Sequence, residues 1–264
     1  MPSAIKGRLW RHDELIVACN LYFTLPFGQM HARNPSVIAL ASALGRTPSS
    51  IAMKLVNFAS LDPAHQARGV SGLKGVSRMD KEVWQEFHAN WSRMASESER
   101  LLEDVLAVDQ KPVKKKVGAA EIVLPAPTQP TERTASVQVR VMQSFFRKAV
   151  LAAYGWQCCV TGNPVPQLLI ASHILPWGDF PEQRLNPSNG LCLAAHLDRA
   201  FDSGLITFGT DMQLVLSSRL RAYLPNQSLQ REFVSIEGSP LRMPERFRPG
   251  SEFVEYHRQN IFRP

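Results

Sequence analysis

Apolar residues recur at helical spacing in the first half of the chain, and turn residues separate the stretches that have this spacing. Asn34-Pro35 and Thr47-Pro48 each join a capping side chain to a proline at the first helical position. Asp80 is placed to begin a longer helix that carries a stripe of aromatic residues. We predict helices over residues 10–25, 35–44, 48–58, 80–106 and 137–156.

The second half of the chain alternates short apolar runs with loops rich in proline, glycine and asparagine. Runs of this length, bounded by turn residues, are typical of strands. We predict strands over 168–174, 190–193, 205–208 and 213–216, a short helix over 196–202, and a last helix near the end of the chain. The expected fold class is therefore α+β.

These patterns divide the chain into two domains joined by a linker. Residues 1–106 are expected to form a helical domain, and residues 137–264 an α+β domain. Residues 107–136 hold four prolines and a run of three lysines, with few apolar residues to anchor them. We expect this segment to be an extended linker.

Composition and charge narrow the classes of protein that fit. The net charge is +7, which suits a polyanion partner such as nucleic acid. No apolar run approaches the length of a membrane span, and the first residues lack a signal peptide's apolar region, so we expect a cytoplasmic protein without membrane partners. The four cysteines contain no C-x-x-C pair, so no structural zinc is expected.

The helices predicted over 35–44 and 48–58 have the outline of a helix-turn-helix. Many helical domains contain such a corner without touching DNA. Here no acidic residue occurs between Leu15 and Leu61, which favours contact with phosphates. The polar residues expected to contact DNA are Arg46, Ser49, Ser50, Lys54 and Asn57.

The strongest candidate chemistry lies between residues 170 and 208. His173 ends an apolar strand before a loop, where a neutral imidazole can accept a proton from water. Asn189 begins the next strand, and its amide could hold the loop that positions His173. The alternatives are a structural histidine and an ordinary turn asparagine.

The helix predicted over 196–202 offers metal ligands. Asp198 and Asp202 are four residues apart and share one helical face, as two ligands of an Mg²⁺ or Mn²⁺ ion would. His196 lies two residues before Asp198. If it caps this helix, its side chain could turn into the site, and it is then a further candidate catalytic residue. The alternative is a solvated acidic face.

Several spaced motifs in this region carry a resemblance to a known family. The motifs are C-V-T-G at 159–162, L-L-I-A-S-H-I-x-P-W at 168–177, N-G-L-x-L at 189–193 and H-L-D-R-A-F-D-x-G-L-I at 196–206. Together they resemble the HNH endonuclease family, in its zinc-free branch, over roughly 145–264. The resemblance implies a ββα-metal finger that cuts DNA with a divalent metal.

The resemblance also assigns roles to individual residues. By this resemblance His173 matches the family's general base and Asn189 its orienting asparagine. For the third residue of the H-N-H motif there are two candidates. Asp198 has the spacing from Asn189 that the metal ligand has in the family, and His196 has the expected residue type. Ser172 departs from the family, because the residue before the base is often an Asp or His ligand. The motif L-G-R-T-P-x-S-I-x-x-K-L-x-N-F is similar to a region that precedes HNH domains in some restriction-like proteins, which implies DNA targeting.

We therefore expect a two-domain, metal-dependent DNA endonuclease of restriction or defence type. Its partner is double-stranded DNA, with modified DNA among the candidate targets, and a homodimer is one way to cut both strands. A DNA-binding regulator that retains an inactive nuclease fold is the alternative. RNA cleavage is not excluded by the sequence.

Overall fold

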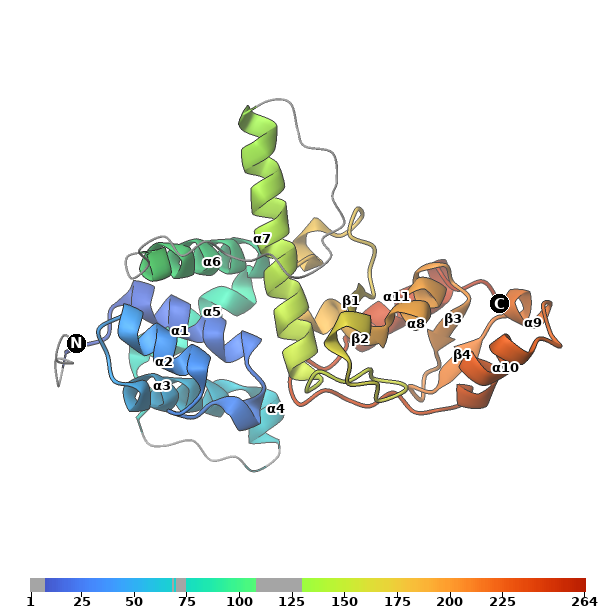
Figure 1. Cartoon of the computed structure of the whole chain (residues 1–264), viewed down its shortest axis with the longest axis horizontal. Helices are drawn as coiled ribbons and strands as arrows, with labels where there is room; N and C mark the ends of the chain where they lie inside the picture. The colour runs from blue at the N-terminus through green and yellow to red at the C-terminus, as the bar shows by residue number, and fades with distance from the viewer. Residues whose placement is uncertain (1–7, 68, 70–74, 108–129) are drawn as a thin grey trace.

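The computed structural model describes residues 8–67, 69, 75–107 and 130–264, and the side chains of residues 130–141 are not described. Within these ranges, no helix has both the length and the apolar character needed to cross a membrane. The first half of the chain is helical (Figure 1). Its elements are α1 His12–Thr24, η1 Phe27–Gln29, α2 Pro35–Ala43, α3 Pro48–Leu61, α4 Pro63–Gln66, α5 Arg78–Ala89 and α6 Trp91–Ala107.

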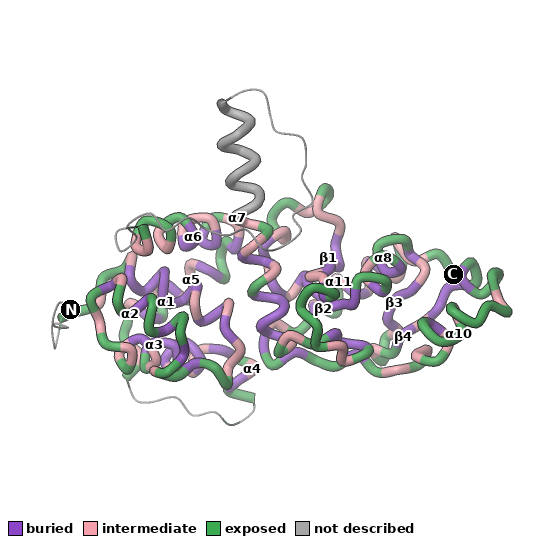
Figure 2. Tube along the Cα trace, in the orientation of Figure 1, coloured by how far each residue is buried: buried purple, intermediate pink, exposed green. Residues whose placement is uncertain are grey.

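Helix α1 is the centre of this helical group. Nine of its residues are buried (Figure 2), and it contacts α2, α3, α5 and α6. The two predicted helix starts are confirmed by their caps. The Asn34 side chain accepts a hydrogen bond from the Ser36 amide at 2.8 Å, and Thr47 accepts one from the Ser50 amide at 3.2 Å.

The single long helix predicted over 80–106 is wrong, because the chain breaks at Asn90. This residue has φ −155° and ψ 88°, and its side chain accepts a hydrogen bond from Arg93 N at 2.9 Å. The bond stabilises the start of a new helix. Asp80 is not the cap of α5 either, because Ser77 occupies that position and forms a capping box with Asp80.

Helix α7, Pro130–Ala153, begins earlier than predicted. Residues 130–136 of the expected linker are therefore helical, and residues 108–129 lie outside the described ranges. Figure 1 shows α7 standing between the N-terminal helices and the C-terminal strands. It contacts α1 and α6 on one side and both strands of the first hairpin on the other.

The C-terminal half is built around small antiparallel sheets, so the predicted α+β fold class is confirmed. Strand β1, Leu169–His173, pairs with β2, Gly190–Ala194. Strand β3, Ile206–Phe208, pairs with β4, Leu214–Leu216. The remaining elements are η2 Pro166–Leu168, η3 Pro181–Gln183, η4 Pro187–Asn189, α8 Ala195–Asp202, α9 Ser218–Arg221, α10 Gln227–Glu232, η5 Val234–Ile236 and α11 Ser251–Asn260.

A buried arginine joins the C-terminal segment to the helical half. The Arg246 guanidinium has no exposed surface and donates hydrogen bonds to the carbonyl oxygens of Tyr22, Phe23 and Leu25. These carbonyls lie at the C-terminal end of α1, where helix carbonyls lack partners and the dipole favours a cation. The segment before α11 therefore caps α1.

Candidate active site

The β1–β2 hairpin places the predicted general base beside helix α7. His173 is the last residue of β1 and pairs with Gly190, the first residue of β2. A Cβ atom at Gly190 would lie 2.4 Å from Val150 and 3.0 Å from Phe146, both on α7. Glycine is therefore needed at this point, because it lets α7 approach the hairpin closely.

The imidazole of His173 is held on two sides. Its ring is parallel to that of Phe146, with centroids 3.9 Å apart and an interplanar angle of 8°. The Nε2 atom lies 2.9 Å from the carbonyl oxygen of Arg184, which assigns the proton of the neutral ring to Nε2. Burial lowers the pKa of His173 below its usual 6.5, and the bond to Arg184 opposes part of this shift. The ring is therefore neutral at pH 7, with Nδ1 as its acceptor.

The loop after β1 is held by the buried side chain of Asn189. Its Oδ1 accepts a hydrogen bond from Leu175 N at 2.8 Å, and its Nδ2 donates to Gln183 O at 3.2 Å. The amide thus joins both ends of the loop between His173 and Arg184. This is the geometry expected of a residue that orients the loop.

Asp198 and Asp202 lie on the face of α8 that turns toward His173. Burial raises the pKa of Asp198, while Ser172 and Arg199 lower it. Burial and, to a smaller extent, the nearby charge of Asp198 together raise the pKa of Asp202 to about 6, while Arg199 lowers it. Two carboxylates that repel each other in this way form a favourable site for a cation.

Ser172 lies beside these carboxylates and has an unsatisfied hydroxyl. Its Oγ atom is buried and has no hydrogen-bond partner among the described residues. The hydroxyl is near enough to Asp198 to lower the pKa of that carboxyl, yet it falls outside hydrogen-bonding geometry. An oxygen ligand or a water molecule bound to both groups would satisfy it.

One cavity of about 500 Å³ brings these groups together. Ser172, His173, Asp198 and Asp202 all line it, with Trp177 at its side. A second cavity of about 330 Å³ continues past His173 and Trp177 toward α7. The two cavities share His173 and Trp177 in their linings, so the imidazole borders both of them.

His257 also lines the larger cavity but has a structural role. It is stacked on Phe201 with centroids 3.6 Å apart. Its ring nitrogens hydrogen bond to Thr207 Oγ1 at 2.9 Å and to Phe201 O at 3.1 Å. Burial lowers its pKa to about 4, so the ring is neutral at pH 7. Because both nitrogens are engaged, His257 holds α11 against α8.

The donor set fits one divalent cation that prefers oxygen ligands. The chain offers two carboxylates and a hydroxyl, which are hard ligands of the type that Mg²⁺ and Mn²⁺ bind. No group of three or more His, Cys, Asp and Glu side chains gathers with metal-binding geometry in the described parts of the chain. The remaining coordination positions are thus left for water and phosphate.

The structure corrects the prediction for His196. This side chain is exposed, does not line the cavity and faces Phe233, with ring centroids 5.9 Å apart. The reason is helical geometry, because a residue two positions before Asp198 points to the opposite side of α8. The helix begins at Ala195, so His196 is not its cap.

The structure also corrects the predicted outer face of α3. Lys54 and Asn57 are buried. The Lys54 ammonium lies 2.7 Å and 2.9 Å from the two carboxylate oxygens of Asp80, and Asn57 donates to Gly75 O at 3.1 Å. Both side chains turn inward because α5 places a buried carboxylate beside α3. Neither is free to contact DNA.

Arg46 is likewise engaged within the helical group. Its guanidinium pairs with Glu14 at 2.6 Å and lies 3.9 Å from the ring centroid of Trp10. Ser49 is exposed and Ser50 is half-buried at the start of α3. These two serines are the predicted DNA contacts that solvent can still reach.

Sequence reasoning did not identify the partners of His173. Phe146, Trp177 and Arg184 all touch or hold the imidazole, from α7 and from the loop after β1. Trp177 meets the imidazole edge to face, with centroids 5.2 Å apart. The P-W-G turn was visible in the sequence, but nothing local indicated that its aromatic ring faces the histidine.

Comparison with known proteins supports the expected family. A family model described as HNH endonuclease matches residues 158–209. This range contains His173, Asn189, Asp198 and Asp202 and ends at the β3–β4 turn. A search of curated proteins found no match.

Proposed function

Because residues 158–209 belong to the HNH endonuclease family, we propose that this chain is a metal-dependent DNA endonuclease of restriction or defence type. An HNH domain of this kind implies a nuclease that acts on DNA. The observation that carries the proposal is the shared cavity of His173, Asp198 and Asp202. In this proposal the protein acts in the cytoplasm on double-stranded DNA, modified or unmodified.

His173 acts as the general base. With its Nε2 proton donated to Arg184 O, its Nδ1 accepts a proton from water. The resulting hydroxide attacks phosphorus, and the bond to the 3′ oxygen breaks. The stack with Phe146 and the amide of Asn189 hold the imidazole in position, which is how orientation contributes to the rate.

Asp198 and Asp202, with the Ser172 hydroxyl, would hold one Mg²⁺ or Mn²⁺ ion. The bound ion would stabilise the negative charge that develops on the phosphate and on the leaving 3′ oxygen. Ser172 stands where many relatives have an Asp or His ligand, so we expect metal affinity to depend strongly on the two carboxylates.

The first test is nicking of supercoiled plasmid in the presence of Mg²⁺ or Mn²⁺. His173→Ala should lower the rate by about 10²- to 10⁴-fold, the usual contribution of a general base. His196→Ala is the matched control, because it removes an exposed histidine from the same domain and should leave nicking unchanged. The proposal fails if His173→Ala nicks like the wild type, or if neither metal supports nicking of unmodified or modified DNA.

One ββα finger cuts one strand, so double-strand cleavage requires two copies or two successive nicks. Compared at equal consumption of supercoiled plasmid, the ratio of linear to nicked plasmid should then rise with protein concentration if a homodimer forms. A ratio that does not change with protein concentration would indicate independent nicks.

The second candidate is a DNA-binding regulator with an inactive nuclease fold, and Ser172 favours it. A neutral hydroxyl is a poorer ligand than a carboxylate, so the site could fail to bind metal. This candidate predicts a gel shift without cleavage and no rise in melting temperature on addition of metal.

A further inference from the structure

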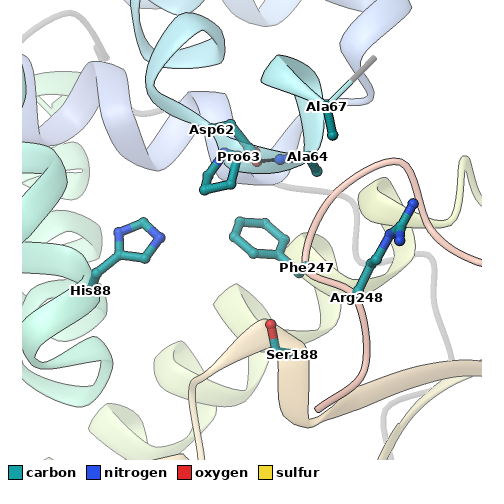
Figure 3. A pocket seen from close by; sticks show the side chains of 8 residues that line it. All are labelled: Asp62, Pro63, Ala64, Ala67, His88, Ser188, Phe247 and Arg248. Carbon is teal, nitrogen blue, oxygen red and sulfur yellow. Dashed lines mark hydrogen bonds between the residues drawn. The ribbon is translucent and has the colours of Figure 1, made fainter. Parts of the chain in front are cut away.

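A separate cavity lies between the helical half and the C-terminal segment. It measures about 360 Å³, which is within the usual range for small-ligand sites. Residues far apart in the chain meet around it: Pro63 at the start of α4, His88 near the end of α5, Ser188 in η4, and Phe247 and Arg248 before α11. Figure 3 shows the His88 ring and the Ser188 hydroxyl directed toward the Phe247 ring, with Arg248 on the other side of that ring.

The aromatic ring of Phe247 forms one wall of the cavity, and the backbone of this residue has an unusual conformation. Its φ is 54°, a left-handed value that a bulky residue adopts only where its surroundings enforce it. The neighbouring Arg246 supplies this constraint through its hydrogen bonds to the end of α1. The ring packs against Trp91 at 5.6 Å between centroids and remains half-exposed at the cavity.

Among the described residues, polar groups with unused hydrogen-bonding positions lie around this wall. His88 hydrogen bonds through Nδ1 to Trp84 O at 2.8 Å, which leaves Nε2 as an acceptor when the ring is neutral. In Figure 3 its ring faces Phe247 across the cavity. In the described part of the chain, the Ser188 hydroxyl makes no hydrogen bond and the exposed Arg248 guanidinium makes no ion pair.

We propose that this cavity receives a single base flipped out of the DNA duplex, stacked on Phe247 and read by His88 and Ser188. A flat heterocycle with donors and acceptors on its edge matches an aromatic wall with two free polar groups. Arg248 contacts the backbone phosphate of the flipped nucleotide. This inference rests on the proposed action on DNA.

The position of Ser188 connects the cavity to the cleavage site. Ser188 precedes Asn189, whose side chain holds the loop of the general base. A base bound against Ser188 therefore lies next to the segment that orients His173. The cavity selects which nucleotide is held while a phosphate is cut, so Phe247, His88 and Ser188 are specificity-determining residues.

The test measures binding without cleavage, by fluorescence anisotropy in EDTA. The probes are one labelled duplex with a central unpaired nucleotide and the same duplex with an abasic residue at that position. An unpaired base costs less to extrude, so the wild type should bind the first probe about tenfold more tightly, the contribution of one stacked base. Phe247→Ala and Phe247→Leu should remove this preference and leave the affinity for the abasic probe unchanged.

Phe247→Leu retains apolar packing if Phe247→Ala loosens the fold. The matched control is Tyr223→Ala, because Tyr223 is an exposed aromatic residue that does not line the cavity. Replacing His88 by Ala should abolish any preference among the four bases at the unpaired position. The proposal is overturned by equal affinity of the wild type for both probes, or by an equal loss for both probes in Phe247→Leu.

Plasmid nicking separates this inference from the proposed nuclease function. If the wild-type protein nicks plasmid but binds both probes equally, the proposal that the cavity binds a base is overturned and the proposed nuclease function is not. If the protein prefers the unpaired base but nicks no plasmid with either metal, the base-binding cavity is supported and the proposed nuclease function is overturned.

Discussion

The Nε2 atom of His173 lies 2.9 Å from the carbonyl oxygen of Arg184. This contact decides which ring nitrogen carries the proton, and Nδ1 is left as the base. The loop that contains Arg184 therefore sets the chemistry of a histidine on the neighbouring strand. Because Asn189 holds that loop, the position and tautomer of His173 depend on a short network rather than on one residue.

The pH dependence of nicking follows from the pKa of His173. Burial lowers this pKa below 6.5, and only the neutral ring accepts a proton. The rate at saturating metal should therefore be level above about pH 6.5 and begin to fall only at a pH below that value. A rate profile measured between about pH 5 and 8 tests this, and a midpoint above 6.5 would contradict it.

A prediction about metal and pH follows from Asp202, whose pKa is about 6. Below that pH a proton competes with the cation for the carboxylate. The metal concentration that gives half the maximal nicking rate should therefore rise as pH falls through 6. A half-maximal concentration that does not change between pH 7 and 5.5 would exclude Asp202 as a ligand.

Asp202→Asn should stabilise the metal-free protein. The folded-state pKa of about 6 lies above the ordinary 3.8, so the folded protein binds more protons and loses stability as pH rises through this window. Since the carboxyl is only partly buried and water screens it, we expect a gain of only about 1 kcal/mol at pH 7. The melting temperature should rise by about 2–4 °C while nicking falls. Asp179→Asn, an exposed position, is the control.

Asn189→Ala should weaken both the fold and the activity. It leaves the Leu175 amide and the Gln183 carbonyl without their partner, at a cost of about 2–4 kcal/mol in the free energy of unfolding. Urea denaturation measures this cost, with the exposed Asn260→Ala as control. Nicking well below the melting temperature should also fall, because the loop no longer fixes the Arg184 carbonyl. Full activity in a destabilised variant would make Asn189 purely structural.

Lys54→Met should act on stability and not on DNA affinity. The change leaves the buried Asp80 carboxylate unpaired, which costs about 3–5 kcal/mol. Adding Asp80→Asn should recover part of the loss, because the two changes share one interaction. Denaturation and gel shifts measure both effects. Weaker DNA binding with unchanged stability would restore the original assignment of Lys54.

Local signals explain which parts of the fold were predictable. The caps at Asn34 and Thr47 and the strand that ends at His173 depend on neighbours in sequence, and the structure contains them. The break at Asn90 had no Gly or Pro to mark it, so two helices were predicted as one. Pattern and spacing therefore located elements better than their ends.

The candidate site also has features that the sequence predicts and features that it does not. The shared face of Asp198 and Asp202 follows from helical spacing, and spacing also turns His196 away. The burial of Lys54 depends on Asp80, 26 residues further along the chain, and the stack of His173 on Phe146 depends on how α7 meets the hairpin. Such long-range contacts leave no periodic trace in a single sequence.

Arg246 has a consequence for protein engineering. Its guanidinium enters the end of α1 from a point 224 residues away from Tyr22 in sequence. A chimera that exchanges the helical half for another targeting module would leave this guanidinium buried without acceptors, and it would release the backbone strain held at Phe247. Changing the target preference of this chain is therefore better attempted by substitutions on the existing halves than by grafting a foreign one.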